Sequence, residues 1–527
     1  MVSQQPDGRR QRGGTSRQQE GNVVALSRRE WLIGAAALPA LAETARAAPA
    51  DTLRFGLSSY PPSLQPWANT GTAALTVKTL LHRGLLMFGT DGKVKGALAS
   101  SWARDGKNGW SFKLRDALFH NGQKVTAEDV KWSLEQIMAP TSTAYLRGQF
   151  QAIASIEAPD AKTVRILMKQ PTVTLPLMLA TPFAPVIAKG SLNAAGGIGA
   201  GPYTLTAQER GVSLSFAAFA KFYEPGHPKL RAIHMPVYAD ENARVAALQS
   251  GDVDMIEYVP WQAMAGIQKN PKLVLNTVDG PYMALAFNGG TGPFKDERLR
   301  QAVAHAIRRE EIVAAAFFGR GTVLEGLPIT KSSEFYDPKY AHGWNYDPKL
   351  AKQLMAAAGV PNGFDCTLLS TAQYGMHLAT AQVVQQHLAA IGIKVKLDLP
   401  DWATRVAMGN RGQYEFCVQG QTADNNDPDG LSAYIDGTLP PDNARSYHLP
   451  TPEIHKLLAE GRAEFDPAKR RAIYDELQRV AIKVVPLAAL CWRAQGYAMT
   501  KNVHGFTNMP GGLNFYSGYS LENVYFG

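Results

Sequence analysis

Residues 381–397 read AQVVQQHLAAIGIKVKL, and this stretch decides the class of the fold. Its apolar side chains first recur at the spacing of one helix face; they are Ala381, Val384, Leu388 and Ile391. Gly392 then closes the helix, and apolar and polar residues alternate from 393 to 397, as they do in a strand. A helix followed at once by a strand predicts an α/β fold.

The same two patterns recur on both sides of this stretch. Alternating runs predict strands at 53–57, 110–114, 163–168, 233–237 and 282–287. Thr126 and Asp129 have the spacing of a capping box, which predicts that a helix begins there. Further helices are expected at 241–250, 299–307, 348–358 and 467–484. Helices and strands intermix throughout, which supports the α/β class.

Length and charge narrow the range of functions. A chain of 527 residues suits two or three packed domains. Its net charge is +9, from 54 basic and 45 acidic residues, and no long basic run occurs in the body of the chain. A nucleic-acid surface needs a clustered basic patch, so we do not expect a nucleic-acid partner.

Motifs of catalysis and metal binding are missing from the sequence. It holds no G-x-S-x-G, no H-E-x-x-H and no phosphate-binding G-x-x-x-x-G-K-[ST]. Its three cysteines, Cys366, Cys417 and Cys491, are far apart and form no C-x-x-C, so we expect buried thiols rather than a metal or redox site. We therefore expect no enzyme activity, metal or cofactor. An exported hydrolase is the rival from another class.

The N-terminus has the pattern of an export signal. Residues 27–32 read SRREWL, a twin-arginine sequence, and a modest apolar run continues to Ala42. Ala45-Arg46-Ala47 then provides a small-x-small cleavage site. This order predicts a twin-arginine signal peptide within residues 1–47 and a mature protein in the periplasm.

Five short motifs, in the same order, are similar to those of one family. They lie at 118–130 (LFHNGQKVTAEDV), 198–203 (IGAGPY), 247–254 (ALQSGDVD), 287–308 (from FN through PFKD to AVAHAIR) and 346–359 (YDPKLAKQLMAAAG). In these motifs the chain resembles the extracytoplasmic solute-binding proteins of family 5, the oligopeptide, dipeptide and nickel type.

This resemblance implies a two-lobed periplasmic-binding-protein fold with two hinge crossings. Lobe I is expected at 51–285 plus 490–527, with an extra subdomain at about 83–194, and lobe II at 286–489. The crossings would lie near Tyr282–Phe287 and Pro486–Arg493. The implied function is the substrate-binding component of an ABC importer, a monomer that captures a small solute by hinge closure and delivers it to permease subunits in the inner membrane.

The resemblance also implies where the ligand binds. Asp424 takes the position of the family's partner for a ligand ammonium, and Gly420, Gln421 and Thr422 would offer backbone groups to a peptide-like ligand. An Asx turn at Asp424 is the alternative, because Asp-Asn runs commonly form turns. Trp402 lies where a pocket aromatic is expected, with a core position as its alternative.

Three more residues complete the predicted site. Ser59 and Tyr60 follow Ser58 in the loop that faces the ligand from lobe I, and Tyr282 lies on the first crossing.

Two departures from the family pattern leave the solute open. Gln421 replaces an aromatic residue, and Val418 replaces an arginine that receives carboxylates in some members; Arg411 lies nearby as a substitute. We expect a peptide-like or amine-bearing solute, with an opine, a sugar or a nickel chelate as alternatives. His448 is the histidine considered for a chelate.

The export signal generates the first prediction. Replacing Arg28 and Arg29 by lysines should abolish export, because the twin-arginine route reads that pair. Cell fractionation measures how much protein is exported. The size of the exported chain shows whether the mature protein starts near Ala48, as expected. Undiminished export of the double-lysine variant would contradict the prediction.

Overall fold

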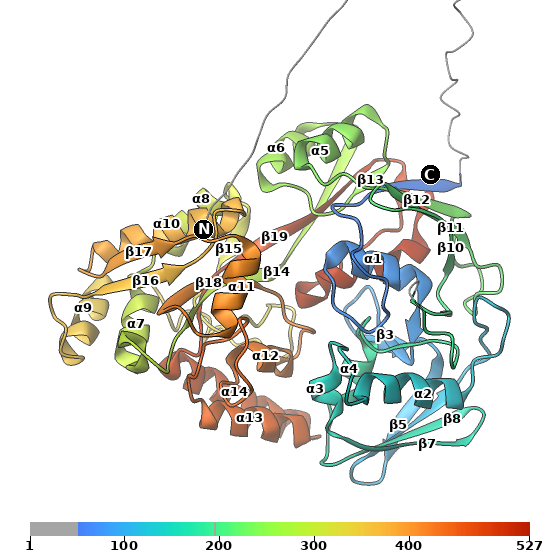
Figure 1. Cartoon of the computed structure of the whole chain (residues 1–527), viewed down its shortest axis with the longest axis horizontal. Helices are drawn as coiled ribbons and strands as arrows, with labels where there is room; N and C mark the ends of the chain where they lie inside the picture. The colour runs from blue at the N-terminus through green and yellow to red at the C-terminus, as the bar shows by residue number, and fades with distance from the viewer. Residues whose placement is uncertain (1–50, 194–195) are drawn as a thin grey trace, which may run out of the picture. The chain divides into compact units, whose positions relative to one another are not determined.

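The computed structural model describes residues 51–193 and 196–527, and these residues have a mixed α/β architecture (Figure 1). Their main feature is an eleven-stranded sheet. In pairing order its strands are β10 (Tyr203–Glu209), β11 (Ser213–Ala218), β12 (Ala232–Pro236), β1 (Thr52–Gly56), β13 (Met255–Ile256), β19 (Ala488–Thr500), β14 (Leu273–Phe287), β18 (Phe416–Gln421), β16 (Asp365–Leu369) and β17 (Lys394–Asp398), with β15 (Gly321–Val323) pairing with β19 outside that order. The predicted signal peptide lies outside the described residues.

Two long strands, β14 and β19, connect the two halves of this sheet. They pair antiparallel from Leu273 opposite Thr500 to Leu285 opposite Ala488. Near one end β19 also pairs with β13, and near the other end β14 pairs with β18. The ribbon formed by β14 and β19 therefore runs from the first lobe, around β1 and β10–β12, into the second lobe, around β16–β18.

The strand predicted at 282–287 is only the second part of β14. The sequence pattern stops there because Gly280-Pro281 normally ends a strand. In the structure a register shift between Asp279 and Tyr282 accommodates this pair, so the strand continues back to Leu273.

Helices and small sheets cover each lobe (Figure 1). The second lobe carries α7 (Glu297–Ala306), α8 (Arg309–Phe317), α9 (Pro348–Ala357), α10 (Gly375–Ala389), α11 (Trp402–Asn410), α12 (Ser432–Ile435), α13 (Pro452–Ala463), α14 (Pro467–Val484) and the 3₁₀ turns η3 (Pro293–Lys295) and η4 (Pro428–Leu431). The first lobe carries α1 (Thr72–Leu81) and the 3₁₀ helix η5 (Gly511–Asn523), while α5 (Glu241–Ser250) and α6 (Trp261–Lys269) lie beside the β14–β19 ribbon.

A separate four-stranded sheet has its own core. Its antiparallel order is β5 (Ala99–Asp105), β6 (Gly109–Leu114), β8 (Thr163–Met168) and β7 (Ile153–Asp160), accompanied by α2 (Ala127–Met138), α3 (Arg147–Phe150) and α4 (Leu175–Ala180). Three short pairs complete the strands: β2 (Arg83–Gly84) with β9 (Pro185–Val186), β3 (Leu86–Phe88) with β4 (Val94–Gly96), and β20 (Val503–His504) with β21 (Tyr525–Phe526). The two-lobed α/β class is confirmed, while the chain positions of the lobe boundaries stay predictions.

Local sequence signals locate the helix ends well. The stretch that predicts a helix and a strand at 381–397 forms α10 and β17. Gly251 ends α5 in the left-handed conformation, with φ 83°. Asp347 and Asp466 cap α9 and α14, and proline follows each cap.

The three cysteines are buried and unpaired, as expected from their spacing. In the described part of the chain, none of the helices has the length and apolar character needed to cross a membrane.

The capping box of α2 generates the second prediction. Asp129 donates its backbone N–H to the Thr126 hydroxyl at 3.4 Å, and its carboxylate accepts from the Thr126 backbone N–H at 3.0 Å. Thr126→Ala should destabilise the protein by about 1 kcal/mol, because it leaves a helix-end N–H without a partner. Thermal unfolding measures the loss. Thr126→Ser keeps the hydroxyl and should unfold like the wild type; an equal loss in both variants would show that the cap is not the cause.

Candidate functional site

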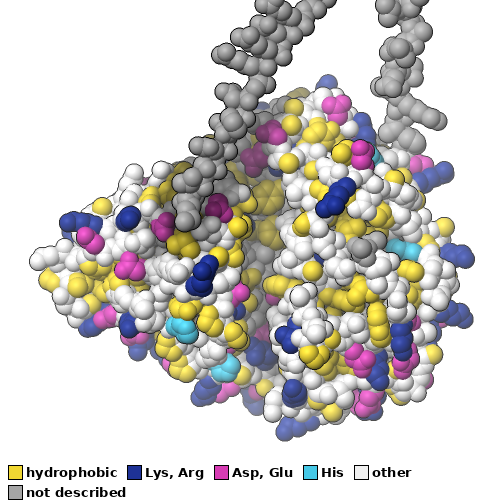
Figure 2. Space-filling model, viewed as in Figure 1, with side chains coloured by type: hydrophobic (Ala, Val, Ile, Leu, Met, Phe, Trp, Pro, Cys, Tyr) yellow, Lys and Arg dark blue, Asp and Glu magenta, His cyan; other side chains and the backbone are white. Residues whose placement is uncertain are grey.

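A cavity of about 930 Å³ lies beside the β14–β19 ribbon, where residues of both lobes meet. Figure 2 shows the surface hollowed between the two lobes. The first-lobe loop after β1 and the α5–α6 region form one wall, while α8, α10, α11 and β18 form the other. The lining includes Ser58, Arg244, Tyr374, Met376, His377, Trp402, Gly420 and Arg493.

Trp402 is the aromatic centre of the second wall. It opens α11, where Asp401 is the N-cap, and its backbone N–H donates to the Gln373 side chain at 3.0 Å. The Tyr374 and His377 rings lie 5.3 and 5.5 Å from its ring. The structure therefore places Trp402 in the cavity wall, half-buried, rather than in the core.

A buried arginine, Arg405, packs against the Trp402 ring. The Arg405 guanidinium lies 5.1 Å from the Trp402 ring centre. It donates to the Val418 carbonyl at 2.6 Å and to the Asn443 side chain at 3.1 Å. Because these bonds and the ring occupy it, Arg405 fixes the wall rather than facing a solute.

His377 is a neutral polar group in the same wall. Burial, reinforced by the charges of Arg405 and Arg493, lowers its pKa to about 3. Its Nδ1 has no hydrogen-bond partner. A Cβ at Gly420 would lie 3.3 Å from the His377 Nε2, so the glycine at this predicted site position leaves room for the imidazole ring.

Arg493 brings a positive charge to the cavity. It lies in β19, is 5 % exposed and donates from Nη1 to the Met376 sulfur at 3.2 Å. Its Nε has no partner, and none of the ion pairs among the described residues includes it. Arg493 is not among the predicted site residues, although one signal was present: an arginine inside the otherwise apolar run from 485 to 494.

The arginine considered as a substitute lies elsewhere. Arg411 is exposed at the end of α11, donates to the Ala407 carbonyl at 3.1 Å and does not line the cavity. Val418 is buried in β18. Arg493, unlike Arg411 and Val418, lines the cavity.

Asp424 lies in the loop after β18 and contacts the first lobe. Its Oδ1 accepts from the Tyr145 hydroxyl at 2.7 Å, and its carbonyl accepts from the Tyr516 hydroxyl at 3.1 Å. Burial raises the pKa of its carboxyl to about 6, since the Tyr145 hydrogen bond only partly offsets the loss of water. No ion pair among the described residues gives it a cation.

The turn expected as the alternative at Asp424 is made by its neighbours. The Asn425 side chain accepts from the Asp427 N–H at 2.9 Å, and the Asp427 carboxylate accepts from the Asp429 N–H at 2.9 Å. The Asp424 carboxylate makes no turn bond; its hydrogen bond goes to Tyr145. The Asx turn is therefore real but begins one residue later.

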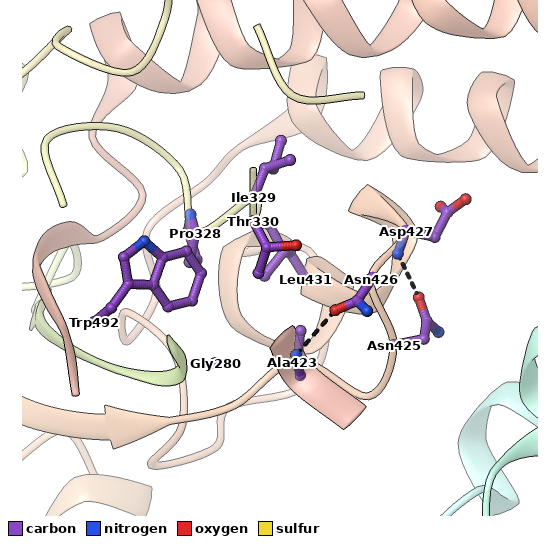
Figure 3. A pocket seen from close by; sticks show the side chains of 11 residues that line it. Gly280, Pro328, Ile329, Thr330, Ala423, Asn425, Asn426, Asp427, Leu431 and Trp492 are labelled. Atoms are coloured by element: carbon purple, nitrogen blue, oxygen red, sulfur yellow. Dashed lines mark hydrogen bonds between the residues drawn. The ribbon is translucent and has the colours of Figure 1, made fainter. Parts of the chain in front are cut away.

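Asn426 connects this loop to the C-terminal segment, beside the small pocket that Figure 3 shows. Its side chain donates to the Pro510 carbonyl at 3.0 Å and accepts from the Gly512 N–H at 2.9 Å. The adjoining pocket, which Trp492 and Ala423 also line, has a volume of about 10 Å³. This is the space of one water molecule, so a solute needs the larger cavity.

Some of the other predicted site residues line the cavity, and the rest lie outside it. Gly420 and Trp402 line the cavity, and so does Ser58 beside the exposed Ser59. The Tyr60 hydroxyl bonds to Gln208.

Near the Asp424 loop, neighbouring groups already occupy the polar atoms. The Gln421 amide donates to Gln419 at 3.3 Å, and the Thr422 hydroxyl donates to the Gly512 carbonyl at 3.4 Å. Tyr282 is fully buried between the Tyr434 and Trp492 rings.

The histidine considered for a metal chelate does not line the cavity. His448 is exposed and packs against Tyr447 with ring centres 4.3 Å apart. Among residues 51–193 and 196–527, His, Cys, Asp and Glu side chains form no group of three that could hold a metal ion.

Comparisons with known proteins indicate a single family. The sequence profile of the bacterial extracellular solute-binding proteins, family 5 Middle, matches residues 93–441. The glutathione-binding protein GsiB of Pectobacterium atrosepticum is 29% identical over 508 residues, which cover 93% of this chain and 97% of that protein.

Solved structures agree with this. The periplasmic binding protein AgaA of A. tumefaciens R10, in complex with agropinic acid, is 42% identical with a TM-score of 0.82, covering 90% of this chain and 99% of its own. DppA of Helicobacter pylori, in complex with the peptide STSA, is 21% identical with a TM-score of 0.78, covering 90% of this chain and 98% of its own.

The raised pKa of Asp424 generates the third prediction. The folded state holds the proton up to about pH 6, whereas an unfolded aspartate releases it near pH 4. The stability that this protonation contributes is therefore complete below pH 4 and is lost as the pH rises through 6. Asp424→Asn carries no charge, so it should stabilise the solute-free protein at pH 7, by at most about 3 kcal/mol, and have little effect at pH 4.

Thermal melts of the solute-free protein at both pH values measure this. Asp427→Asn is the matched contrast, because the Asp427 carboxylate pairs with Arg470 at 2.7 Å and its loss leaves a buried guanidinium unpaired. This variant should melt lower at pH 7. If Asp424→Asn also melts lower at pH 7, the carboxylate is not a source of instability.

Proposed function

The chain belongs to family 5 of the bacterial extracellular solute-binding proteins, which serve ABC importers, and from this membership we propose that its solute is an acidic opine. The 42% identity to a binder of agropinic acid, over nine-tenths of the chain, carries this proposal. That identity exceeds the 29% shared with a glutathione-binding protein and the 21% shared with a peptide-binding one.

The cavity suits such a solute. Its volume of about 930 Å³ is in the range of small-molecule sites. Its walls combine aromatic rings at Trp402 and Tyr374 with polar groups at Ser58, His377 and Arg493. Flat rings pack against carbon chains and sugar-like rings, while the polar groups fix the orientation of the solute.

A peptide-like, amine-bearing solute is the second candidate, and Asp424 favours it. A carboxylate that has only a tyrosine hydroxyl as donor gains most from a cation. In this proposal the ligand reaches beyond the cavity residues to Asp424, which receives the ammonium, and Gly420, Gln421 and Thr422 present the edge of β18 and its continuation to the ligand backbone. Ser59, Tyr60 and Tyr282 remain the proposed supporting residues.

We propose capture by hinge closure about the β14–β19 ribbon. Several contacts already join the lobes beyond the cavity. The Val173 N–H donates to the Arg462 carbonyl at 2.8 Å, and the Arg104 guanidinium lies 3.7 Å from the Phe465 ring centre. Such contacts, together with the one between Tyr145 and Asp424, would hold the closed form around a solute and exclude water from it.

The remaining parts of the proposal concern the protein in the cell. It would be exported to the periplasm by the twin-arginine route, act as a monomer and release its solute unchanged to ABC permease subunits in the inner membrane. The motif at residues 27–32 supports the route. The absence of catalytic motifs from the sequence supports binding without turnover.

The opine proposal generates the fourth prediction, which titration calorimetry with defined solutes tests. The wild type should bind agropinic acid at least about tenfold more tightly than glutathione or the peptide STSA, a difference of about 1.4 kcal/mol. Chromatography of the solute after prolonged incubation should recover it intact.

Asp424→Asn separates the two candidates. It should weaken glutathione binding by about 30-fold to several thousand-fold if Asp424 receives an ammonium. Tighter binding of glutathione or STSA than of agropinic acid would replace the opine with the amine-bearing solute. Hydrolysis of any of the three at catalytic rates would favour the exported hydrolase.

A further inference from the structure

The β14–β19 ribbon carries a buried cation that has no anion. Arg493 is 95 % shielded from solvent, its Nε has no acceptor, and a thioether sulfur is the acceptor recorded for its Nη1. A buried charge without a partner costs several kcal/mol, so an arginine in such a place gains strongly from an incoming anion.

The strand geometry directs this guanidinium into the cavity. Successive residues of a strand face opposite sides, and the neighbouring Trp492 lines the small pocket near Asn426 while Arg493 lines the large cavity. Arg493 therefore lies on the side of α10, which supplies Met376 and His377.

The other buried arginines in or beside this cavity already donate from their Nη atoms to oxygen atoms. Arg244 donates to the Tyr238 carbonyl at 2.7 Å and to the Tyr258 carbonyl at 2.9 Å. Arg405 donates to Val418 and Asn443 and does not line the cavity. Among the described cavity residues, Arg493 is thus the buried guanidinium without an oxygen acceptor.

We infer that Arg493 binds a carboxylate of the solute, and that the neutral His377 and the Trp402 ring shape the space beside it. Guanidinium and carboxylate match as a planar pair with two parallel N–H···O bonds, which a lysine cannot form. This inference rests on the proposed function, because it requires a solute with an acid group. It assigns the acid end of that solute to the second-lobe side of the cavity.

The test compares Arg493→Gln with the wild type by titration calorimetry. The probes are agropinic acid and the methyl ester of its acid group, in which that charge is removed. Arg493→Gln should weaken binding of the acid by about 30-fold to several thousand-fold. It should change binding of the ester by less than about threefold, and Arg493→Lys should be intermediate for the acid.

Arg411→Gln is the matched control, since it removes an exposed arginine of the second lobe that lies outside the cavity. It should bind both probes like the wild type. A solute-free thermal melt checks that Arg493→Gln is folded, and the ester provides a second check because a folded variant still binds it. Wild-type affinity of Arg493→Gln for the acid would overturn the inference.

Failure of the proposed function is distinguishable from failure of this inference. If the wild type binds neither agropinic acid nor glutathione, the solute proposals fail. Arg493 is then tested by mass spectrometry of the solute released on denaturing wild type and Arg493→Gln purified from rich medium. The wild type should release a carboxylate-bearing solute that Arg493→Gln lacks. A solute without a carboxylate, equal retention by both proteins, or no acidic solute by either route would overturn the inference.

Discussion

The antiparallel pairing of β14 with β19 is the constraint on which the rest of the structure depends. These two strands continue one hydrogen-bonded sheet through both lobes, so the ladder fixes where the lobes meet. The register shift between Asp279 and Tyr282 lies within this ladder. There Gly280 passes so close to the C-terminal segment that a Cβ would come within 2.0 Å of the Gly511 carbonyl oxygen. Both Arg493 and Tyr282 take their positions from this ribbon.

Two unpaired charges of opposite sign flank the ribbon. Asp424 has hydroxyl groups around it but no cation, and Arg493 has rings and a thioether but no anion. Buried charges without a partner of opposite sign reduce the stability of the solute-free protein. A solute that supplies the missing partner recovers that free energy on binding, so solute recognition and fold stability are linked through the same few side chains.

Much of the fold could be predicted from local sequence. The capping box at Thr126, the glycine at 251 and the helix-to-strand stretch at 381–397 all form the expected elements, because these signals act within a few residues. The residues of the candidate site were harder to predict from the sequence. Tyr145 meets Asp424 across 279 residues, and no local pattern encodes such a contact. Arg493 was hidden because a single arginine in a strand has no periodicity, and its meaning depends on which face of β19 it occupies.

The alternation of side-chain faces along β19 limits how the protein can change during evolution. Trp492 and Arg493 are neighbours that face different pockets. Deleting or inserting one residue on either side of them within β19 would exchange their faces, placing the guanidinium among the residues around Ala423 and the indole in the cavity. Surface loops tolerate changes in length, but this ribbon does not. Lineages that acquire new solutes should therefore vary in the side chains of the walls and in the loops, while the residue count of β14 and β19 stays constant.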